Sequence, residues 1–297
     1  MRLGVDLGGT KTEIIALADD GRELLRQRIP TPQGDYMATL KAIARLVESV
    51  ENSLGQRGTV GIGIPGAESL ATGLIKNANS TCLIGKPLKR DLQALLQREI
   101  RLANDANCFA LSEAVDGSGQ DAGIVFGIIL GTGVGGGIVI NRQVLTGANA
   151  IAGEWGHNPL PLPSGDDLPL PPCYCGRAGC TEAYLSGPAL AADHCRHTGQ
   201  TLSASEIDRL AADGDLACEA SLRRYEDRLG RALAGVINLL DPQVIVIGGG
   251  LSKMQRLYRH LPECCGRHVF SDVFNTKFLP PMHGDSSGVR GAAWLWD

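Results

Sequence analysis

Residues 2–18 read RLGVDLGGTKTEIIALA, and this stretch decides the fold. The apolar run 2–7 predicts a strand, Gly8-Gly9 predicts a tight turn, and residues 12–18 predict a second strand. A third strand is expected at about residues 23–29, after a hairpin turn. The chain therefore begins with hairpin-linked strands whose first turn is built from glycine.

The same order of strand, glycine turn and strand recurs in the second half of the chain. An apolar strand is expected at 123–130, a glycine-rich turn at 131–137 and a returning strand at 138–141. Further helix and strand patterns lie at residues 35–55, 60–64, 88–99, 101–103, 106–115, 216–240, 243–247 and 289–296. The pattern predicts an α/β fold with two similar lobes that face one another across a cleft.

The length of the chain agrees with two lobes. With 297 residues and about 150 residues per domain, two domains are expected. We expect residues 1–117 to form a small N-terminal lobe, completed by the C-terminal helix 288–297. Residues 118–287 would form a large lobe that includes a cysteine-rich loop.

The composition excludes several classes of protein. Hydrophobic residues make up 43% of the chain, which is too many for a disordered protein. The 28 basic and 32 acidic residues give a formal net charge of −4, which argues against nucleic acid or an anionic membrane as partner. The longest apolar stretch, near residues 124–140, is broken by glycines, and Asp6 stands where a signal peptide needs apolar residues. We therefore expect a cytoplasmic protein.

The first glycine turn has the residue types of a phosphate loop. Asp6 precedes Gly8 and Gly9, and Thr10 and Lys11 follow them. Glycines let backbone N–H groups approach phosphate oxygens, while Thr10 and Lys11 add donors. Asp6 would suit a metal and its water shell beside nucleotide phosphates. An ordinary hairpin with a Gly-Gly turn is the alternative.

Two further glycine clusters end apolar strands. Their leading residues are Gly131, Thr132 and Gly133 in one cluster and Gly249, Gly250 and Leu251 in the other. The cluster at 131–133 is not a P-loop, because no Gly-Lys-Ser/Thr follows it. It is not a convincing dinucleotide-binding fingerprint either, because a strand follows it where that fingerprint needs a helix. The other opens a helix and would let an adenosine lie against the backbone. Three glycine loops at strand ends indicate a nucleotide site more specifically than any one of them.

Asn104-Asp105 lies where the strand at 101–103 meets the helix at 106–115. There Asp105 can accept a proton from an attacking hydroxyl, the task of a base in phosphoryl transfer. Asp and Asn are also preferred helix N-caps, so a structural role is the alternative. The two roles are compatible, since Asn104 or Asn107 can fix the turn.

Acidic and imidazole side chains gather further along the chain. Glu154 and His157 stand three residues apart with a glycine between them, and Glu182 follows Cys180 by two residues. Side chains of these types that bind hydroxyl groups are typical of carbohydrate sites. Each glutamate alone is equally typical of an exposed surface.

Residues 173–180 read CYCGRAGC and hold Cys173, Cys175 and Cys180, three of nine cysteines. In a reducing cytosol this density favours a metal site over disulfides. Three thiolates and one imidazole satisfy tetrahedral zinc, and His157 is the best candidate for the fourth ligand. Four protein ligands leave no open position, so the zinc would be structural.

Together these motifs resemble the ROK family (repressor, open reading frame, kinase), and among its members most closely the bacterial fructokinase/mannokinase type. The resemblance covers the whole chain, and the stretches nearest to that type are 76–81, 153–159 and 283–294. N-acetylglucosamine kinases are similar too, including over residues 104–114. The family implies two ribonuclease-H-like lobes of the actin/hexokinase-like ATPase fold, ATP with Mg²⁺ in the cleft, and a structural Zn²⁺.

The resemblance also implies roles for residues. Asp105 resembles the catalytic base that activates the 6-hydroxyl of the sugar. The implied sugar-binding set is Gly66, Asn79, Asn104, Asp105, Glu154, His157 and Glu182. The implied ATP-binding set is Asp6, Gly8, Gly9, Thr10, Lys11, Gly131, Thr132, Gly133, Gly249, Gly250 and Leu251. His157 would bind zinc through one ring nitrogen and donate to a sugar hydroxyl through the other.

The activity implied is ATP-dependent phosphorylation of a hexose at its 6-hydroxyl, with D-fructose first and mannose also possible. An N-acetylglucosamine or glucose kinase is the alternative, followed by a sugar-sensing regulator of the same family. Such regulators resemble this chain with an added DNA-binding domain, which we do not expect because the phosphate-loop strand begins at Arg2. ROK kinases are commonly dimers, so a homodimer is expected.

Overall fold

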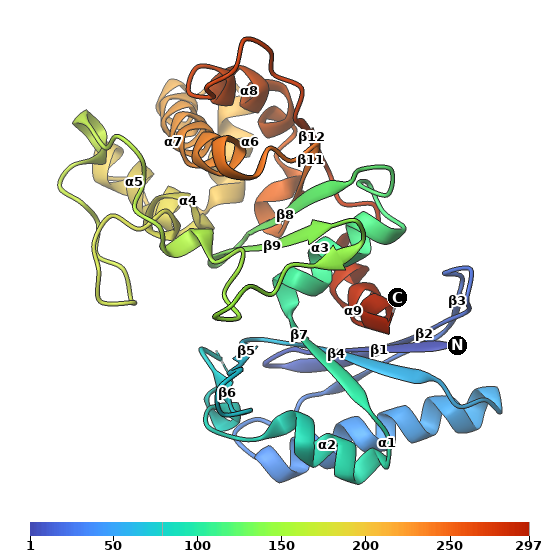
Figure 1. The fold of residues 1–297 in the computed structure, drawn as a ribbon. Coiled ribbons are helices and arrows are strands. Elements are labelled where there is room, and N and C mark those ends of the chain that lie inside the picture. Colours follow the sequence, from blue (N-terminus) through green and yellow to red (C-terminus); the bar gives the residue numbers. More distant parts are fainter. Residues whose placement is uncertain (79, 297) are drawn as a thin grey trace. The chain divides into compact units, whose positions relative to one another are not determined.

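The computed structural model of the chain describes residues 1–78 and 80–296 (Figure 1). Asn79, a predicted sugar-binding residue, lies outside the described residues, as does Asp297. The strands are β1 (Arg2–Leu7), β2 (Lys11–Leu17), β3 (Glu23–Pro30), β4 (Thr59–Ile64), β5 (Ala67–Glu68), β6 (Ile75–Lys76), β7 (Ile100–Asn104), β8 (Ile124–Leu130), β9 (Val134–Ile140), β10 (Gln143–Val144), β11 (Val244–Gly248) and β12 (Lys277–Leu279). The α-helices are α1 (Tyr36–Leu54), α2 (Leu88–Leu96), α3 (Asp105–Val115), α4 (Glu182–Leu185), α5 (Gly187–Thr198), α6 (Ala204–Ala212), α7 (Leu216–Leu240), α8 (Gln255–Gly266) and α9 (Ser287–Ala293).

The chain divides into two compact units. The first consists of Met1–Asp121, Gly137–Ala152 and Met282–Asp297, and the second of Ala122–Gly136 and Gly153–Pro281. The lobe boundary that the sequence suggests between residues 117 and 118 stays a prediction.

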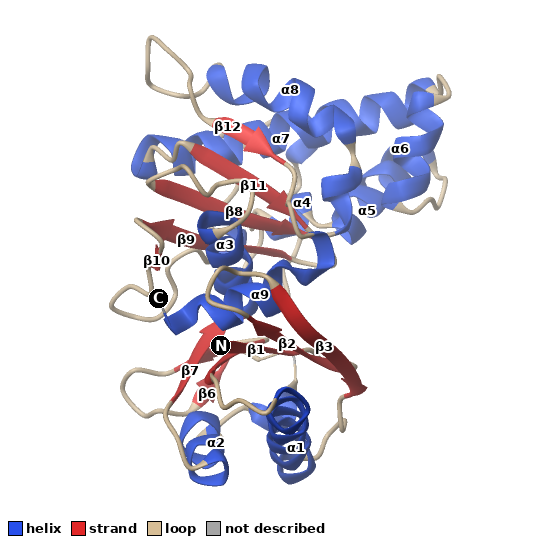
Figure 2. Ribbon diagram, turned by 90° about the vertical axis from the view of Figure 1, so that its right-hand side faces the viewer, coloured by secondary structure: helices blue, strands red, loops and turns tan. Residues whose placement is uncertain are grey.

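The first unit is built on a five-stranded sheet in the order β3-β2-β1-β4-β7. Strands β1, β2 and β3 pair antiparallel, while β1, β4 and β7 run parallel. Figure 2 shows α1 and α2 on one face of this sheet and α9 on the other. Because parallel strands end at the same edge, the glycine turn after β1, Gly66 after β4 and Asp105 after β7 all lie at one edge of the sheet.

Helix α1 follows the boundaries that its sequence signals predict. The Asp35 side chain caps its start by accepting from the Ala38 N–H at 2.9 Å, and Gly55 ends it in a left-handed conformation. Leu40, Ile43 and Val47 on its apolar face are fully or almost fully buried in one core with residues of β1 and β4. Burial of each such side chain contributes about 1.5–3 kcal/mol, so this face fixes α1 on the sheet.

Helix α9 lies on the opposite face of the sheet, backbone against backbone. A Cβ on Gly4 of β1 would meet the carbonyl of Val289, and one on Gly61 of β4 would meet that of Ala292. Gly291 of the helix faces the carbonyl of Cys108 in the same way. Glycine at these three positions is therefore a packing requirement, since a side chain there would push α9 away from the sheet or from α3.

The second sheet has the strand order β10-β9-β8-β11-β12. Here the prediction of a glycine turn over 131–137 is wrong in part, because β9 begins at Val134 and includes the three glycines that follow. The neighbours of two of these glycines leave no room for a side chain: a Cβ on Gly136 would lie 2.8 Å from the Trp155 ring, and one on Gly137 would lie 2.8 Å from the Asn107 Cα. Gly136 and Gly137 therefore serve close packing, and the turn itself is limited to residues 131–133.

In the second unit, helices α7 and α8 cover one face of β8, β11 and β12 (Figure 2). Helix α7 matches its predicted range of 216–240, and a capping box formed by Ser203 and Glu206 begins α6. Among the described residues, no helix combines the length and the apolar character needed to cross a bilayer.

Candidate active site

The turn after β1 presents backbone donors and an ammonium group. The Gly8 N–H donates to the Lys11 carbonyl at 3.1 Å, which closes the turn, and the Thr31 hydroxyl donates to the Gly8 carbonyl at 2.8 Å. Gly9, Thr10 and Lys11 are exposed. A cavity of about 340 Å³ opens beside this turn, with Gly9, Thr10 and Thr31 among its lining residues. The turn can therefore receive an anionic group.

Two carboxylates approach one another at the edge of the first sheet. Burial, followed by the charges of Asp105 and Glu13, raises the pKa of Asp6 to about 6, against the opposing charge of Lys11. Asp105 itself is exposed at the first position of α3. Carboxylates drawn together without a cation repel, so Asp6 fits the role of a partner for a divalent ion.

Asn104 and Asp105 both contact the start of α3, and Asn104 also reaches the loop after β4. The Asn104 side chain is the N-cap of α3, accepting from the Ala106 N–H at 2.9 Å, and its amide donates to the Gly66 carbonyl at 3.2 Å. The Asp105 carboxylate also accepts from the Ala106 N–H, at 2.8 Å. Asn104 therefore ties the end of β7 to the loop after β4, which fixes Asp105 beside Gly66.

In the second unit, the glycine turn and Glu182 form one constellation. The Val134 N–H donates to the Glu182 carboxylate at 2.8 Å, and a Cβ on Gly133 would lie 2.7 Å from that carboxylate. The Gly187 N–H donates to the Gly131 carbonyl at 2.7 Å. Thr132 is exposed between them. The start of α5 therefore holds one end of the turn and Glu182 holds the other.

The third glycine cluster follows β11. Gly249 has φ +81°, and a Cβ on it would collide with the Leu130 carbonyl, so only glycine fits there. Gly250 is exposed and begins a 3₁₀ turn, Gly250–Lys253, in which Leu251 is buried. The backbone at this strand end is therefore open, and the adenosine site expected there stays a prediction.

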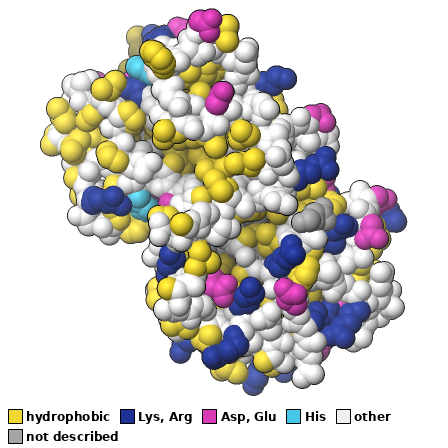
Figure 3. Space-filling view, viewed as in Figure 1, with side chains coloured by type: hydrophobic (Ala, Val, Ile, Leu, Met, Phe, Trp, Pro, Cys, Tyr) yellow, Lys and Arg dark blue, Asp and Glu magenta, His cyan; other side chains and the backbone are white. Residues whose placement is uncertain are grey.

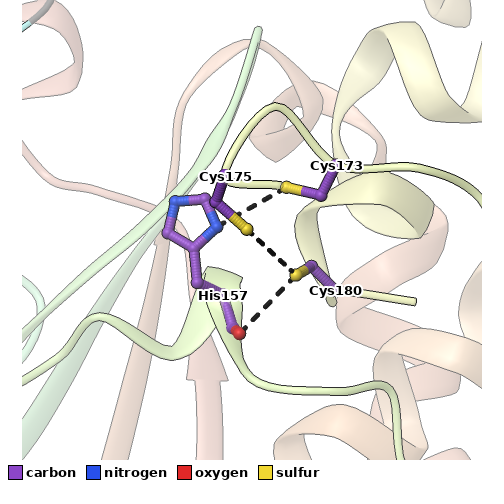
Figure 4. A group of neighbouring side chains, drawn as sticks. All are labelled: His157, Cys173, Cys175 and Cys180. Atoms are coloured by element: carbon purple, nitrogen blue, oxygen red, sulfur yellow. Dashed lines mark hydrogen bonds between the residues drawn. The ribbon is translucent and has the colours of Figure 1, made fainter. Parts of the chain in front are cut away.

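The predicted metal ligands come together (Figure 4). The ligand atoms of His157, Cys173, Cys175 and Cys180 all lie within 4.8 Å of one another. The Cys173 Sγ is 3.7 Å from the His157 Nδ1, and the Cys175 Sγ is 3.6 Å from the Cys180 Sγ. Ligands about 2.3 Å from a tetrahedral ion are roughly 3.8 Å apart, so the cluster has the dimensions of a zinc site.

The thiols of this cluster differ in acidity. The backbone N–H of Arg177 is the main cause that lowers the pKa of Cys175, to about 6. Burial is the main cause that raises the pKa of Cys180, to about 12. One thiolate is therefore available at neutral pH, and a bound cation would release the proton of the buried thiol.

The sequence motifs assign no role to Tyr174, which stands between two of the cysteines. Its hydroxyl lies 3.0 Å from the His157 Nε2, the nitrogen expected to meet a sugar hydroxyl. A phenol between two ligand positions is the only signal in the sequence, and spacing does not reveal where its ring points.

Glu154 is the remaining predicted sugar-binding residue of the second unit. It is exposed one residue before Trp155, whose indole donates to the Gly135 carbonyl at 2.9 Å.

A buried ion-pair cluster supports the loop between His157 and Cys173, and no motif in the sequence indicates it. Asp167, in the middle of the loop, accepts from the Arg228 side chain at 2.7 Å and from that of Arg231 at 2.9 Å. Arg231 also donates to the loop carbonyls of Pro161 and Leu162. The two arginines lie three apart on α7, a spacing that places both on one helix face.

On the face shown in Figure 3, acidic side chains are interspersed among the lysines and arginines of the first unit, so positive and negative charges are mixed on this face.

Comparison with known proteins identifies relatives over the whole chain. The family model described as "ROK family" matches residues 2–297. An N-acetyl-D-glucosamine kinase of Salmonella newport (strain SL254) is 42% identical over 299 residues, covering 99% of each chain. An N-acetyl-D-glucosamine kinase of Yersinia pseudotuberculosis serotype IB (strain PB1/+) is 40% identical over 299 residues, which cover 99% of this chain and 98% of the relative.

Solved structures show the same fold. A ROK hexokinase from Thermus thermophilus has a TM-score of 0.88 and 32% identity, covering 99% of this chain and 97% of that one. A ROK family glucokinase from Streptomyces griseus, in complex with glucose and AMPPNP, has a TM-score of 0.77 and 28% identity over 99% and 98% of the two chains. The chain therefore belongs to the ROK family and is a sugar kinase with the actin/hexokinase-like ATPase fold.

Proposed function

We propose that this kinase transfers the γ-phosphoryl group of ATP to the 6-hydroxyl of N-acetyl-D-glucosamine. The observation that carries the choice of sugar is the 40–42% identity, along the whole chain, to N-acetyl-D-glucosamine kinases. These relatives do not support D-fructose, which the sequence motifs favour. Fructose and mannose remain in the test as competing substrates.

The chemistry needs a base, and Asp105 is the residue we assign to it. The Asp105 carboxylate accepts the proton of the sugar 6-hydroxyl while the oxygen of that hydroxyl forms a bond to the γ-phosphorus. At the same time the bond between the γ-phosphorus and the leaving oxygen of ADP breaks. Two observations support this assignment: the Asp105 side chain is exposed at the start of α3, and Asn104 is the N-cap of that helix. Gly66 and Asn104 would bind the sugar beside it, together with Asn79.

The phosphates of ATP would lie against the glycine turns. Gly9, Thr10 and Lys11 would supply donors in the first unit, where the Gly8 N–H closes the turn, and residues 131–133 and 249–251 would supply backbone in the second. Asp6 would hold the Mg²⁺ that accompanies ATP, and a divalent ion there would neutralise phosphate charge during transfer. The raised pKa of Asp6 supports a cation at this position.

The cysteine cluster would hold a structural Zn²⁺ through His157, Cys173, Cys175 and Cys180. The fit of the ligand distances supports this assignment. Bound there, the ion would fix the angle of His157 and of the segment that leads to Glu182, both of which we assign to the sugar together with Glu154. We expect about one zinc atom per chain by metal analysis, and loss of that zinc in Cys175→Ala. A wild-type protein that folds fully without metal would refute the zinc site.

A panel of hexoses tests the substrate. ADP release, measured by a coupled assay with ATP and Mg²⁺, should be fastest with N-acetyl-D-glucosamine and slower with glucose, mannose and fructose. A higher kcat/KM for fructose would overturn the proposed sugar while leaving the kinase class intact.

Asp105→Asn tests the base. The substitution keeps the size and the hydrogen-bond acceptor of the helix start but removes the proton acceptor, so kcat should fall by roughly 10²–10⁴-fold. Binding of the sugar, measured by calorimetry, should be retained. Near-normal turnover would exclude Asp105 as the base.

We also propose that the chain forms a homodimer. Leu239 at the end of α7 and Phe270 beyond α8 are 92% and 99% exposed, and the Phe270 N–H donates to the Asn238 side chain at 2.9 Å. Two large apolar side chains held at one place support association. Light scattering at several protein concentrations would give the mass.

A further inference from the structure

The hydroxyl of Tyr174 occupies a hydrogen-bonding position that the proposed reaction needs. Its oxygen is 3.0 Å from the His157 Nε2, and the two rings meet edge to face with centroids 5.2 Å apart. Tyr174 is nevertheless 81% exposed. The phenol is therefore held by His157 and not by burial in the core.

The chemistry of the zinc site fixes the direction of this hydrogen bond. The Nδ1 of His157 faces the Cys173 Sγ at 3.7 Å, on the metal side of the ring. A neutral imidazole that binds zinc through Nδ1 carries its one proton on Nε2. The His157 Nε2–H must then donate, and the Tyr174 oxygen accepts. A single N–H makes one good hydrogen bond, so it serves either the phenol or a substrate hydroxyl.

The surroundings of the phenol are those of the proposed sugar site. Besides partial burial, charges that act on the Tyr174 hydroxyl include those of Glu182 and Glu154. With His157, these are the three side chains of the second unit that we assign to sugar hydroxyls. All three therefore act on the Tyr174 hydroxyl, His157 through a hydrogen bond and the two glutamates through their charges.

We propose that Tyr174 sets the affinity for sugar by competition: its hydroxyl accepts the His157 Nε2–H bond in the empty protein, and a sugar hydroxyl displaces it. This inference rests on the proposed function of the same site. Because the ring is exposed and flanked by loop residues, it can turn away without disturbing the core. The sugar gains the His157 bond only after the phenol has lost it, so the net gain is smaller than for a free N–H.

Tyr174→Phe removes only the competing oxygen and keeps the ring contact. In calorimetric titrations of the zinc-loaded full chain with N-acetyl-D-glucosamine, Tyr174→Phe should bind roughly two- to ten-fold more tightly than wild type, the range expected for one lost hydrogen bond. Its zinc content should be unchanged. Unchanged or weaker binding would overturn the inference, and weaker binding would mean that the phenol contacts the sugar directly.

Tyr36→Phe is the matched control. The Tyr36 hydroxyl donates one hydrogen bond, to Asp91 at 2.8 Å, at a place remote from the cysteine cluster in the sequence. Its loss should leave sugar affinity as in wild type. A gain equal to that of Tyr174→Phe would show that the effect is not specific to His157.

A second measurement needs no sugar and separates this inference from the proposed function. In the zinc-loaded protein labelled with ¹⁵N at histidine, exchange of the His157 Nε2–H with solvent should be faster in Tyr174→Phe than in wild type. Equal exchange rates would overturn the inference even if the protein phosphorylates sugar. If exchange changes as expected but wild type binds no hexose, the proposed function fails, and the displacement by sugar fails with it.

Discussion

At the scale of single residues, Asp6 shows that the site is built at a cost to stability. Its pKa is raised to about 6, first by burial and then by Asp105 and Glu13. A raised carboxylate pKa means that the folded state holds the proton more tightly than the unfolded state. Below pH 3.8 both states are protonated and no penalty exists, whereas above pH 6 the full penalty of the buried charge applies.

Asp6→Asn should therefore stabilise the nucleotide-free protein above pH 6. The gain in the free energy of unfolding should be at most roughly 3 kcal/mol at pH 8 and should vanish as the pH falls toward 4. Urea unfolding at a series of pH values measures it. The exposed Asp121 offers the control Asp121→Asn, which should change stability little at any pH. A gain that is the same at pH 4 and pH 8 would contradict the electrostatic origin.

The sequence predicts the identity of the chemical groups better than their partners. The residues at the strand ends, the capping pair Asn104-Asp105 and the cysteine cluster follow from motifs whose spacing is local. The Tyr174–His157 bond does not follow, because it joins residues from two ends of a long loop. The path of that loop decides which ring nitrogen of His157 faces the metal site and which faces the phenol. Sequence spacing does not reveal this path.

At the scale of elements, the ion pairs of Asp167 hold the loop that carries the cysteine cluster. Asp167 is 4% exposed and faces Arg228 and Arg231, which are 2% and 8% exposed. Asp167→Asn leaves two buried guanidinium groups short of one counter-charge, which should destabilise the protein by about 3–5 kcal/mol. Because the loop joins His157 to Cys173, bound zinc should also pass to a colorimetric chelator faster than in wild type.

Glu226→Gln is a matched control on the same helix. Glu226 is 3% exposed and binds Arg256 of α8, so it also neutralises a partly buried arginine, but it does not contact the loop. It should lower the free energy of unfolding by a similar amount while zinc release stays as in wild type. Equal acceleration of zinc release in both variants would show that global stability, and not the Asp167 contact, retains the metal.

Elements with strong local signals are predicted well, and the glycine run is the exception. Caps and apolar periodicity define α1, α6 and α7 closely. In contrast, residues 135–137 are glycines in a strand, and at Gly136 and Gly137 the side chain of Trp155 and the backbone of Asn107 come too close for a side chain. Glycine in a sequence indicates either a turn or a close contact, and only the tertiary structure distinguishes the two.

At the scale of the whole molecule, the end of the chain completes the unit formed by its beginning. The buried Glu113 of α3 accepts from the Met282 N–H at 3.0 Å and from the Ser287 hydroxyl at 2.7 Å. Asp116 accepts from His283 at 3.2 Å and pairs with Arg290, which also donates to the Gly21 carbonyl. These bonds join segments far apart in sequence, so the packing of α9 depends on non-local contacts with α3 and the first strands.

This junction should depend on pH through His283. Hydrogen bonding to Asp116 is the main cause that raises the pKa of His283 above its usual value of 6.5. Protonation therefore favours the folded state: the contribution is fully present below pH 6.5 and is lost as the pH rises through the raised pKa. His283→Gln should lower the free energy of unfolding by about 1–2 kcal/mol at pH 6, and the difference from wild type should shrink by pH 9.

The control is His268→Gln, because the His268 imidazole has no hydrogen bond or ion pair within residues 1–78 and 80–296. That variant should follow the wild-type pH profile throughout. The measurement is urea unfolding followed by tryptophan fluorescence, since Trp294 and Trp296 lie in the segment that His283 fastens. Equal destabilisation of His283→Gln at pH 6 and pH 9 would contradict this prediction. It would show that the imidazole stabilises the protein through its packing and hydrogen bonds and not through its positive charge.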